Sequence, residues 1–170
     1  MGDNKLIEKA KSGCNDSFDK LIKDRGSKLY KIAYCYVKNE EIALDIVSET
    51  TFKAYINIHK LKNIEFFDTW LMKIAINEAL TAIKKQKKII YLEDYKKDIQ
   101  ENKEPVEEKM DLYKALDKLK KDDKEILVLK YFADLTFLEI SKTMKKSENT
   151  VKTKHYRALE KVKKILEGEK

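Results

Sequence analysis

The segment 147–157 contains hydroxyl and cationic side chains at helical spacing, which is chemistry suited to a nucleic acid. It follows residues 135–144, which have the apolar spacing of a short amphipathic helix, and Ser147 can cap a second helix by accepting a backbone N–H bond. Helix, turn and helix in this order are typical of a helix-turn-helix, whose second helix enters the major groove of DNA. The polar side chains that this second helix offers are Lys152, Thr153, Lys154, Tyr156 and Arg157. Many helical cores have the same layout, so it does not decide the function alone.

Two other charged clusters lie earlier in the chain. Asp45 and Glu49 are four residues apart, so both carboxylates lie on one face of a predicted helix. Residues 84–88 contain four lysines at the end of another predicted helix. Lysines there also suit the helix dipole, but that role does not require four of them. Each cluster taken alone is compatible with an ordinary solvated helix face.

The sequence lacks the residue patterns that catalysis or metal binding requires. No nucleophile is paired with a base, no carboxylate pair has a catalytic setting, and no glycine-rich phosphate loop occurs. Cys14 and Cys35 have no metal-like spacing, and His59 and His155 are far apart and lack neighbouring ligand clusters. We therefore predict a binding protein without a catalytic residue, metal site, cofactor or small-molecule substrate. We expect Cys35 to be a buried, reduced thiol.

The elements that carry these residues are predicted to be α-helices. Only four glycines and one proline occur in 170 residues, and no sustained stretch alternates apolar and polar residues as a strand would. We expect a joint at Lys38–Asn39, a loop over 60–63, and a loosening or break of the first helix at Gly26. Apolar residues recur at three- and four-residue steps in the segments 17–37, 40–58 and 67–88.

Composition divides the chain into two all-α domains. Hydrophobic residues make up 42% of the chain and charged residues 39%, which favours small cores with wide solvated faces. The stretch 93–108 holds the only proline and has seven acidic residues against three lysines, a net charge of −4. We predict helical domains at 1–90 and 109–170, joined by a flexible acidic linker at 91–108. An inert, solvated connector is the alternative to a functional linker.

The C-terminal domain is predicted to contain four helices and to end in a basic segment. Residues 141–170 contain ten basic and four acidic side chains, and the whole chain has a net charge of +7. This balance favours a polyanionic partner, and a lysine-rich solvated surface is the alternative.

Three segments, in this order, resemble the extracytoplasmic-function sigma factors of bacterial RNA polymerase. Residues 43–50 (ALDIVSET) resemble the family's polymerase-binding helix, and residues 70–77 (WLMKIAIN) resemble the helix beside its promoter-melting loop. Residues 116–159, with the runs LTFLEIS and SENTVKTK, resemble the family's fourth domain, a helix-turn-helix. The likeness covers roughly 17–88 and 110–166.

The resemblance implies an alternative sigma factor that binds core RNA polymerase and directs promoter-specific transcription initiation. It implies contacts with the clamp helices of the largest subunit and with the flap region, and a membrane-linked anti-sigma factor in a stress or envelope response. The implied polymerase contacts are Asp45, Ile46, Ser48 and Glu49. The implied contacts with the −10 promoter element are Asn63, Phe66, Trp70, Asn77, Lys84 and Lys87. The implied contacts with the −35 element are Ser147, Thr150, Lys152, Thr153, Lys154 and Arg157.

Several of these roles have alternatives. Trp70 can be a core residue instead of a platform for bases, and Asn77 can be a buried hydrogen-bonding residue. In the C-terminal helix we assign a phosphate contact to Arg157 and base contacts to Lys152 and Thr153, because base contacts cluster near the N-terminal end of a recognition helix.

The chain departs from the family's pattern at a few positions. Ser48 stands where glutamine is usual, Ile76 where arginine is usual, and Lys145 where a turn glycine is common. These departures concern individual polymerase and promoter contacts.

Two other classes of protein are compatible with parts of the sequence. A stand-alone DNA-binding regulator would use the helix-turn-helix without polymerase, and it would leave the motif at 45–50 unexplained. A helical adaptor would make the basic C-terminal helix incidental. We find no signal peptide and no apolar run near the roughly 20 residues of a membrane span, so we expect a cytoplasmic protein.

Overall fold

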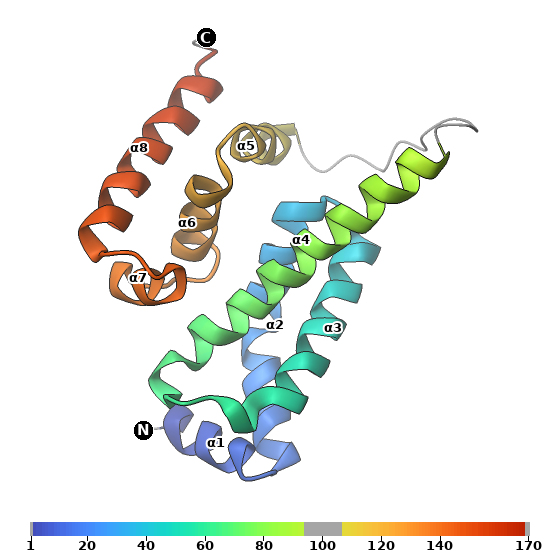
Figure 1. The fold of residues 1–170 in the computed structure, drawn as a ribbon, viewed down its shortest axis with the longest axis vertical. Helices are drawn as coiled ribbons and strands as arrows, with labels where there is room; N and C mark the ends of the chain where they lie inside the picture. The colour runs from blue at the N-terminus through green and yellow to red at the C-terminus, as the bar shows by residue number, and fades with distance from the viewer. Residues whose placement is uncertain (1, 94–106, 169–170) are drawn as a thin grey trace. The chain divides into compact units, whose positions relative to one another are not determined.

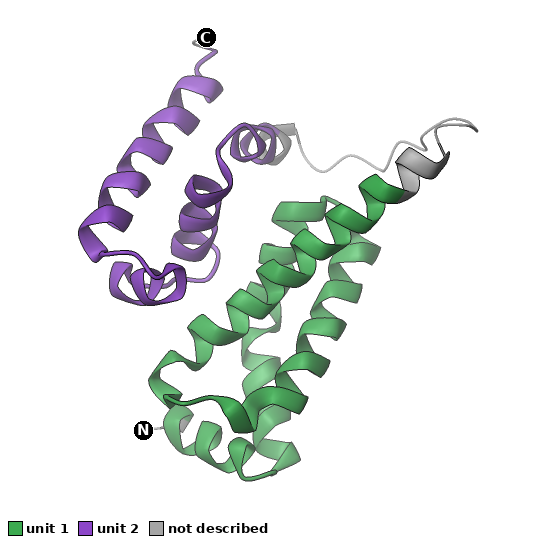
Figure 2. Ribbon diagram, in the orientation of Figure 1, with its two compact units in different colours: residues 1–97 green, residues 98–170 purple. Residues whose placement is uncertain are grey.

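A computed structural model describes residues 2–93 and 107–168, and in these ranges the regular structure is entirely helical (Figure 1). The chain divides into two compact units, Met1–Lys97 and Asp98–Lys170 (Figure 2). The predicted fold class, all-α with two helical domains, is confirmed. Unit 1 contains α1 (Gly2–Lys11), α2 (Asn15–Val37), α3 (Glu40–Asn57), two 3₁₀ turns, η1 (Ile58–Lys60) and η2 (Ile64–Phe66), and α4 (Phe67–Glu93). Unit 2 contains α5 (Glu107–Asp117), α6 (Lys121–Tyr131), α7 (Phe137–Met144) and α8 (Glu148–Leu166).

The core of unit 1 lies between α2, α3 and α4, which pack against one another. The fully buried large side chains come from α2 and α4, and each stabilises the fold by about 1.5–3 kcal/mol. Helix α3 contributes small residues such as Ala43 and Ala54, both fully buried, so its neighbours can approach closely. Because α3 buries small residues, several of its larger apolar side chains remain at the surface. The fully buried large residues of this core are Leu21, Leu29, Ile32, Phe67, Leu71, Met72 and Ile76.

The joint between α2 and α3 lies at Lys38–Asn39, as predicted. Lys38 adopts a left-handed backbone (φ 52°), and its N–H donates to the Tyr34 carbonyl at 2.8 Å. The side chain of Asn39 then accepts the Ile42 N–H at 2.9 Å and caps α3. Helix α2 continues through Gly26, so the expected break there is wrong. Packing of the buried residues on both sides of Gly26 outweighs the cost of one helical glycine, about 1 kcal/mol.

Helix α1 was not expected from the sequence, and it is held in place by long-range polar contacts. The buried guanidinium of Arg25 binds Asp3 of α1 at 2.9 Å and also pairs with Asp68 at the start of α4. Burial alone would lower the pKa of Arg25. The hydrogen bonds and negative charges of Asp68 and, to a smaller extent, Asp3 outweigh burial, so the pKa of Arg25 is raised. The Lys11 ammonium adds a bond of 2.6 Å to the Leu61 carbonyl. Figure 1 shows α1 at the end of unit 1 where α2 and α4 begin.

The predicted linker overlaps the ends of two helices. The α4 backbone reaches Glu93 and the α5 backbone begins at Glu107, so helix extends into both ends of 91–108. Most of the predicted linker, 94–106, lies outside the described residues. None of the helices in the described ranges combines the length and apolar character that crossing a membrane requires.

Unit 2 is built around α8, which packs against α5, α6 and α7. Its core contains side chains from every one of these helices, and the middle of α6, 123–129, is buried throughout. This arrangement leaves one side of α8 exposed along its length. The fully buried large residues of this core are Ile126, Val128, Leu129, Ile140 and Val151.

Candidate nucleic-acid and protein interfaces

Helices α7 and α8 form the predicted helix-turn-helix. Thr136 caps α7, because its hydroxyl oxygen accepts the Glu139 N–H at 3.2 Å and Glu139 Oε2 accepts the Thr136 N–H at 2.7 Å. Lys145 ends α7 with a left-handed backbone (φ 52°), which is the conformation that a turn glycine adopts without strain. Ser147 then caps α8 by accepting the Thr150 N–H at 3.1 Å, as predicted. Both helices of the motif therefore begin with a side-chain cap.

One face of α8 lies in the core of unit 2. Val151, Ala158 and Val162 are buried on this face, and His155 lies among them with only 4% of its surface exposed. His155 was not expected in the core. Its position four residues after Val151 and three before Ala158 is the signal that would have found it.

His155 is held by an aromatic cluster. Its Nε2 lies 3.0 Å from the hydroxyl of Tyr131, and its ring meets Phe137 edge-on with centroids 5.0 Å apart. Its Nδ1 is buried and has no hydrogen-bond partner in the described part of the chain. Burial, followed by the charge of Lys130, lowers the pKa of His155. The folded unit therefore favours a neutral imidazole here.

The predicted −35 contacts on α8 differ in what their side chains bind. Thr150, Thr153 and Arg157 are exposed. Arg157 makes no hydrogen bond or ion pair with any residue that the structure describes. The Lys152 ammonium, in contrast, is paired with Glu148 at 2.7 Å, one helical turn away. Among the cations predicted to contact the −35 element, Arg157 can therefore bind a phosphate without first giving up an ion pair within the protein.

Lys154 faces the first turn of α6. Its Nζ lies 3.5 Å from Asp122, which also binds Lys146 of the turn at 3.2 Å, and Lys161 lies 3.5 Å from Asp123. The bond from Lys146, with the positive charges around it, lowers the pKa of Asp122. The two acids thus connect α6 to the turn and to α8. Sequence reasoning missed this cluster because its pairs are more than twenty positions apart along the chain.

Helix α4 presents the predicted −10 contacts on one stripe. Trp70, Asn77 and Lys84 are each seven residues apart, which brings successive side chains within about 20° of one another around the helix. Asn77 and Lys84 are exposed, so the buried alternative for Asn77 does not hold. Trp70 is half-buried, and its ring lies 5.9 Å from the ring of Phe67, so it both packs and reaches the surface. Lys87 is exposed beside this stripe.

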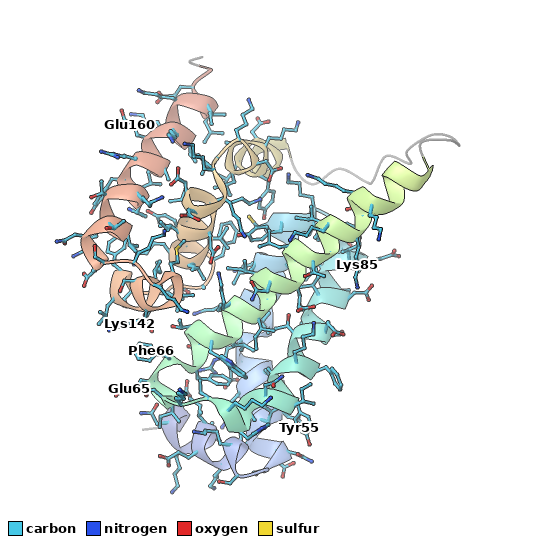
Figure 3. The ribbon with its side chains drawn as sticks, viewed as in Figure 1. Tyr55, Glu65, Phe66, Lys85, Lys142 and Glu160 are labelled. Atoms are coloured by element: carbon cyan, nitrogen blue, oxygen red, sulfur yellow. The ribbon has the colours of Figure 1, made fainter. Side chains whose placement is uncertain are left out.

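The remaining predicted −10 contacts precede α4. Asn63 is exposed, and its side-chain oxygen accepts the Glu65 N–H at 2.9 Å, which begins the η2 turn. Phe66 is half-buried at the end of that turn. Figure 3 shows Phe66 and Lys85 toward opposite ends of α4, so the stripe has an aromatic end and a basic end.

Helix α3 presents three of the four predicted polymerase contacts. Asp45, Ser48 and Glu49 are exposed, and Glu49 lies 3.5 Å from Lys53. Ile46 is 4% exposed because it lies on the face that packs against α2 and α4. This corrects the predicted site, since Ile46 stabilises the core and offers no surface to a partner.

Sequence reasoning missed the exposed apolar residues of α3. The exposed fraction is 57% for Leu44 and 58% for Phe52, and Tyr55 and Ile56 are exposed as well. They lie on the same side of the helix as Ser48, beside Asp45. A depression of about 450 Å³ adjoins them, lined by Phe18, Asp19, Val47, Ser48, Thr51, Phe52 and Tyr55. The sequence could have revealed this face, because these large apolar residues lie outside the buried helical stripe that contains Ala43 and Ala54.

Unit 2 has an apolar pocket of about 330 Å³ between α5, α6 and α8. Its wall is almost wholly apolar, and Tyr131 and Leu112 at its edge are exposed. Such a pocket is suited to an apolar side chain of a protein partner. The lining residues are Leu112, Leu116, Leu127, Tyr131, Phe132, Leu159 and Val162.

No group of three or more His, Cys, Asp or Glu side chains suited to a metal occurs in residues 2–93 and 107–168. Cys35 is fully buried, and both cysteines are free thiols, as predicted for Cys35.

Comparison with known proteins identifies both units. Residues 21–89 match the family described as Sigma-70 region 2, and residues 109–162 match Sigma-70, region 4. RNA polymerase sigma factor SigV of Bacillus subtilis (strain 168) is 38% identical over 139 residues, which cover 81% of this chain and 84% of SigV. The chain belongs to the extracytoplasmic-function sigma factors of RNA polymerase. ECF RNA polymerase sigma factor SigW of the same organism is 28% identical, and the matched region covers 95% of this chain and 95% of SigW.

Solved structures agree on the fold of this sigma factor. CnrH, in its complex with the cytosolic domain of CnrY, covers the whole chain with a TM-score of 0.75 and 19% identity. The sigma factor RpoE from Bartonella quintana, in complex with the anti-sigma factor NepR, covers 84% of this chain with a TM-score of 0.64 and 20% identity.

The family match assigns the two units to transcription initiation. The region 2 match spans α3 and most of α4, which carry the acidic and apolar face and the Trp70–Lys84 stripe. The region 4 match spans α5 to α8 as far as Val162, including the helix-turn-helix. The family resemblance stated from the sequence is therefore confirmed.

Proposed function

We propose that this sigma factor binds core RNA polymerase and the −10 element through its N-terminal domain, 1–90, and the −35 element through its C-terminal domain, 109–170. The observation that carries the proposal is that each matched sigma region presents an exposed face with the chemistry its role needs. The stretch 91–108 then acts as an acidic linker between two DNA-binding domains.

Polymerase docking is assigned to the exposed face of α3. Asp45 and Glu49 supply charge complementary to a basic surface of the clamp helices of the largest subunit, and Ser48 lies between them. Leu44 and Phe52 add apolar contact area, which supplies more of the affinity at a protein interface than rim charges do. Acidic and apolar groups together make this face specific for one partner.

The stripe on α4 and the loop before it are assigned to the −10 element. Phe66 and Trp70 offer aromatic rings on which unstacked bases can stack. Asn77 offers an amide to base edges, and Lys84 and Lys87 offer charge to the phosphates of separated strands. Stacking at one end and charge at the other suit single-stranded DNA.

The helix-turn-helix is assigned to the −35 element, with α8 in the major groove. Its contacts are drawn from Ser147, Thr150, Lys152, Thr153, Lys154 and Arg157. The apolar pocket between α5, α6 and α8 is assigned to the flap region of the polymerase, because it would accept an apolar side chain.

Regulation by an anti-sigma factor is part of the proposal. Two proteins of similar fold were solved as complexes: CnrH with the cytosolic domain of CnrY, and the sigma factor RpoE with the anti-sigma factor NepR. In this proposal a membrane-linked inhibitor covers the apolar and DNA-binding surfaces until a stress or envelope signal releases it. We further propose a cytoplasmic protein that is not an enzyme and uses no cofactor or small-molecule substrate.

A transcription assay on promoter-containing templates, with and without core polymerase, tests the proposal. A sigma factor stimulates specific initiation only with core polymerase and binds promoters weakly alone. A stand-alone regulator would bind specific DNA tightly without polymerase, and an adaptor would change neither binding nor initiation. Specific transcripts that appear only when both proteins are present are the result we expect.

A further inference from the structure

The outward side of α8 carries a stripe formed by Asn149, Thr153 and Tyr156. Spacings of four and seven residues keep these side chains within about 60° of one another around the helix. All three are exposed, Tyr156 to 62%. The fully buried Val151 projects about 200° away from Asn149, so the stripe points directly away from the core of unit 2.

The lysines beside this stripe are engaged within the protein. Lys152 is paired with Glu148 at 2.7 Å, and its Nζ lies 5.9 Å from the ring centroid of Phe137 on α7. Lys154 is directed to Asp122 of α6 at 3.5 Å. Neither ammonium therefore lies on the outward stripe, where base edges would meet the helix.

The hydroxyls near the start of α8 also make hydrogen bonds within the protein. The Thr150 hydroxyl shares a bond of 2.7 Å with the Ser147 hydroxyl, and the Thr153 hydroxyl donates to the Asn149 carbonyl at 2.9 Å. The side-chain amide of Asn149 has no hydrogen bond to any residue in the described part of the chain. It is the second residue of α8, within the turn from which recognition helices contact bases.

An asparagine amide matches one base in the major groove. Its N–H donates to adenine N7 while its oxygen accepts from adenine N6–H, a bidentate pair that no other base offers in the same geometry. Lysine, in contrast, is a point charge that suits phosphate or guanine.

We propose that Asn149 is a specificity-determining residue that reads an adenine of the upstream promoter element, an inference that rests on the proposed function. Lys152 then contacts phosphate, which changes the base-reading role assigned to it from the sequence. Thr153 and Tyr156 line the same groove-facing stripe and present a methyl group and a ring to neighbouring bases.

The test is selection of DNA by the holoenzyme. Core polymerase with the full chain selects from a pool of duplexes randomised over the length of a promoter, and the bound DNA is sequenced. We expect the parent to enrich adenine at one upstream position by roughly 5- to 150-fold over other bases. Asn149→Ala should lose that preference and keep the others. Asn149→Asp keeps the shape but cannot donate to N7, so it should lose the same preference.

The controls separate this inference from the function on which it rests. Asn4→Ala, at an exposed position on α1, and Lys152→Ala should both retain the adenine preference. Alanine is a good helix former and aspartate suits the first turn of a helix, and circular dichroism verifies that both Asn149 variants fold. Enrichment of the same adenine by Asn149→Ala, or its loss in Lys152→Ala, would overturn the inference while the sigma function stands. A parent holoenzyme that enriches no upstream sequence would overturn both.

Discussion

Tyr131 on α6 and His155 on α8 are joined by a hydrogen bond of 3.0 Å between the tyrosine hydroxyl and Nε2 of the imidazole. The bond places a titratable ring in the core of unit 2, with Nδ1 buried and unpaired in the described part of the chain. Burial and then the charge of Lys130 lower the pKa of His155. With a leucine or valine at this position, the stability of unit 2 would not depend on the protonation of a core side chain.

We expect unit 2 to lose stability on mild acidification. The folded pKa of His155 lies below its ordinary value of about 6.5, so the unfolded chain takes up the proton first. His155 therefore leaves the free energy of unfolding undiminished above about pH 6.5. Below that pH the free energy of unfolding decreases until the pH reaches the pKa of His155 in the folded unit. Thermal unfolding across this range should show the loss in the parent and a smaller loss in His155→Leu. His59→Gln, at an exposed position, is the matched control and should behave as the parent. Parallel curves for the parent and His155→Leu would contradict the assignment.

Gly26→Ala should stabilise unit 1 by about 0.5–1 kcal/mol. Gly26 lies inside α2 with helical backbone, and an added Cβ would meet no atom within 4 Å. Gly13, between α1 and α2, is the opposite case, because its φ of +94° favours glycine. Gly13→Ala should therefore destabilise the unit by about 1 kcal/mol or more. Denaturant unfolding of the two variants measures both changes, and equal effects of the same sign would refute this account of α2.

Reversing the acidic charges of α3 should weaken binding to core polymerase. Asp45→Lys with Glu49→Lys should cost about 2–5 kcal/mol if both charges are buried at the interface, and much less if they lie at its rim. Glu8→Lys with Asp24→Lys reverses two exposed charges elsewhere on unit 1 and serves as the matched control. Affinity for core polymerase is measured for each protein, and circular dichroism verifies folding. Unchanged binding by a folded Asp45/Glu49 variant would remove these acids from the docking surface.

Arg157 is expected to bind a phosphate. It is exposed and makes no ion pair with the described residues, and it lies about two and a half turns beyond the start of α8. Arg157→Ala should weaken holoenzyme binding on all promoter sequences alike and reduce the slope of log K against log salt by about one unit. Promoter binding at several salt concentrations gives this slope. Loss of discrimination at one base pair, with an unchanged slope, would show instead that Arg157 reads a base.

The helices that carry the sites were predictable because their apolar residues repeat at three- and four-residue steps. This held for α2, α3 and α4 and for the helix-turn-helix, where Ser147 also marked the start of α8. Helix α1 was missed because its apolar residues are few and because Arg25, twenty-two residues after Asp3, fixes its position. Local periodicity contains no information about such a contact.

The exposure and the pairing of the candidate site residues were only partly predictable. Asn77 and Lys84, which the family resemblance named, are both exposed, whereas the sequence had left open whether Asn77 is buried. Ile46 was assigned to the surface by its motif, although the small residues around it turn that face inward. The pairing of Lys154 with Asp122 joins residues 32 positions apart, so it depends on tertiary packing that no local pattern reveals.

Mapping of transcript 5′ ends on a library of genomic fragments tests the central claim most directly. Core polymerase is assayed alone, with the parent chain, and with the Asp45/Glu49 charge-reversal variant. We predict starts that appear only with the parent and that share −10 and −35 sequences at a constant spacing, and we predict that the variant loses them. Starts that are the same with and without the chain, or new starts with no shared upstream sequence, would contradict the claim that this protein directs RNA polymerase to promoters.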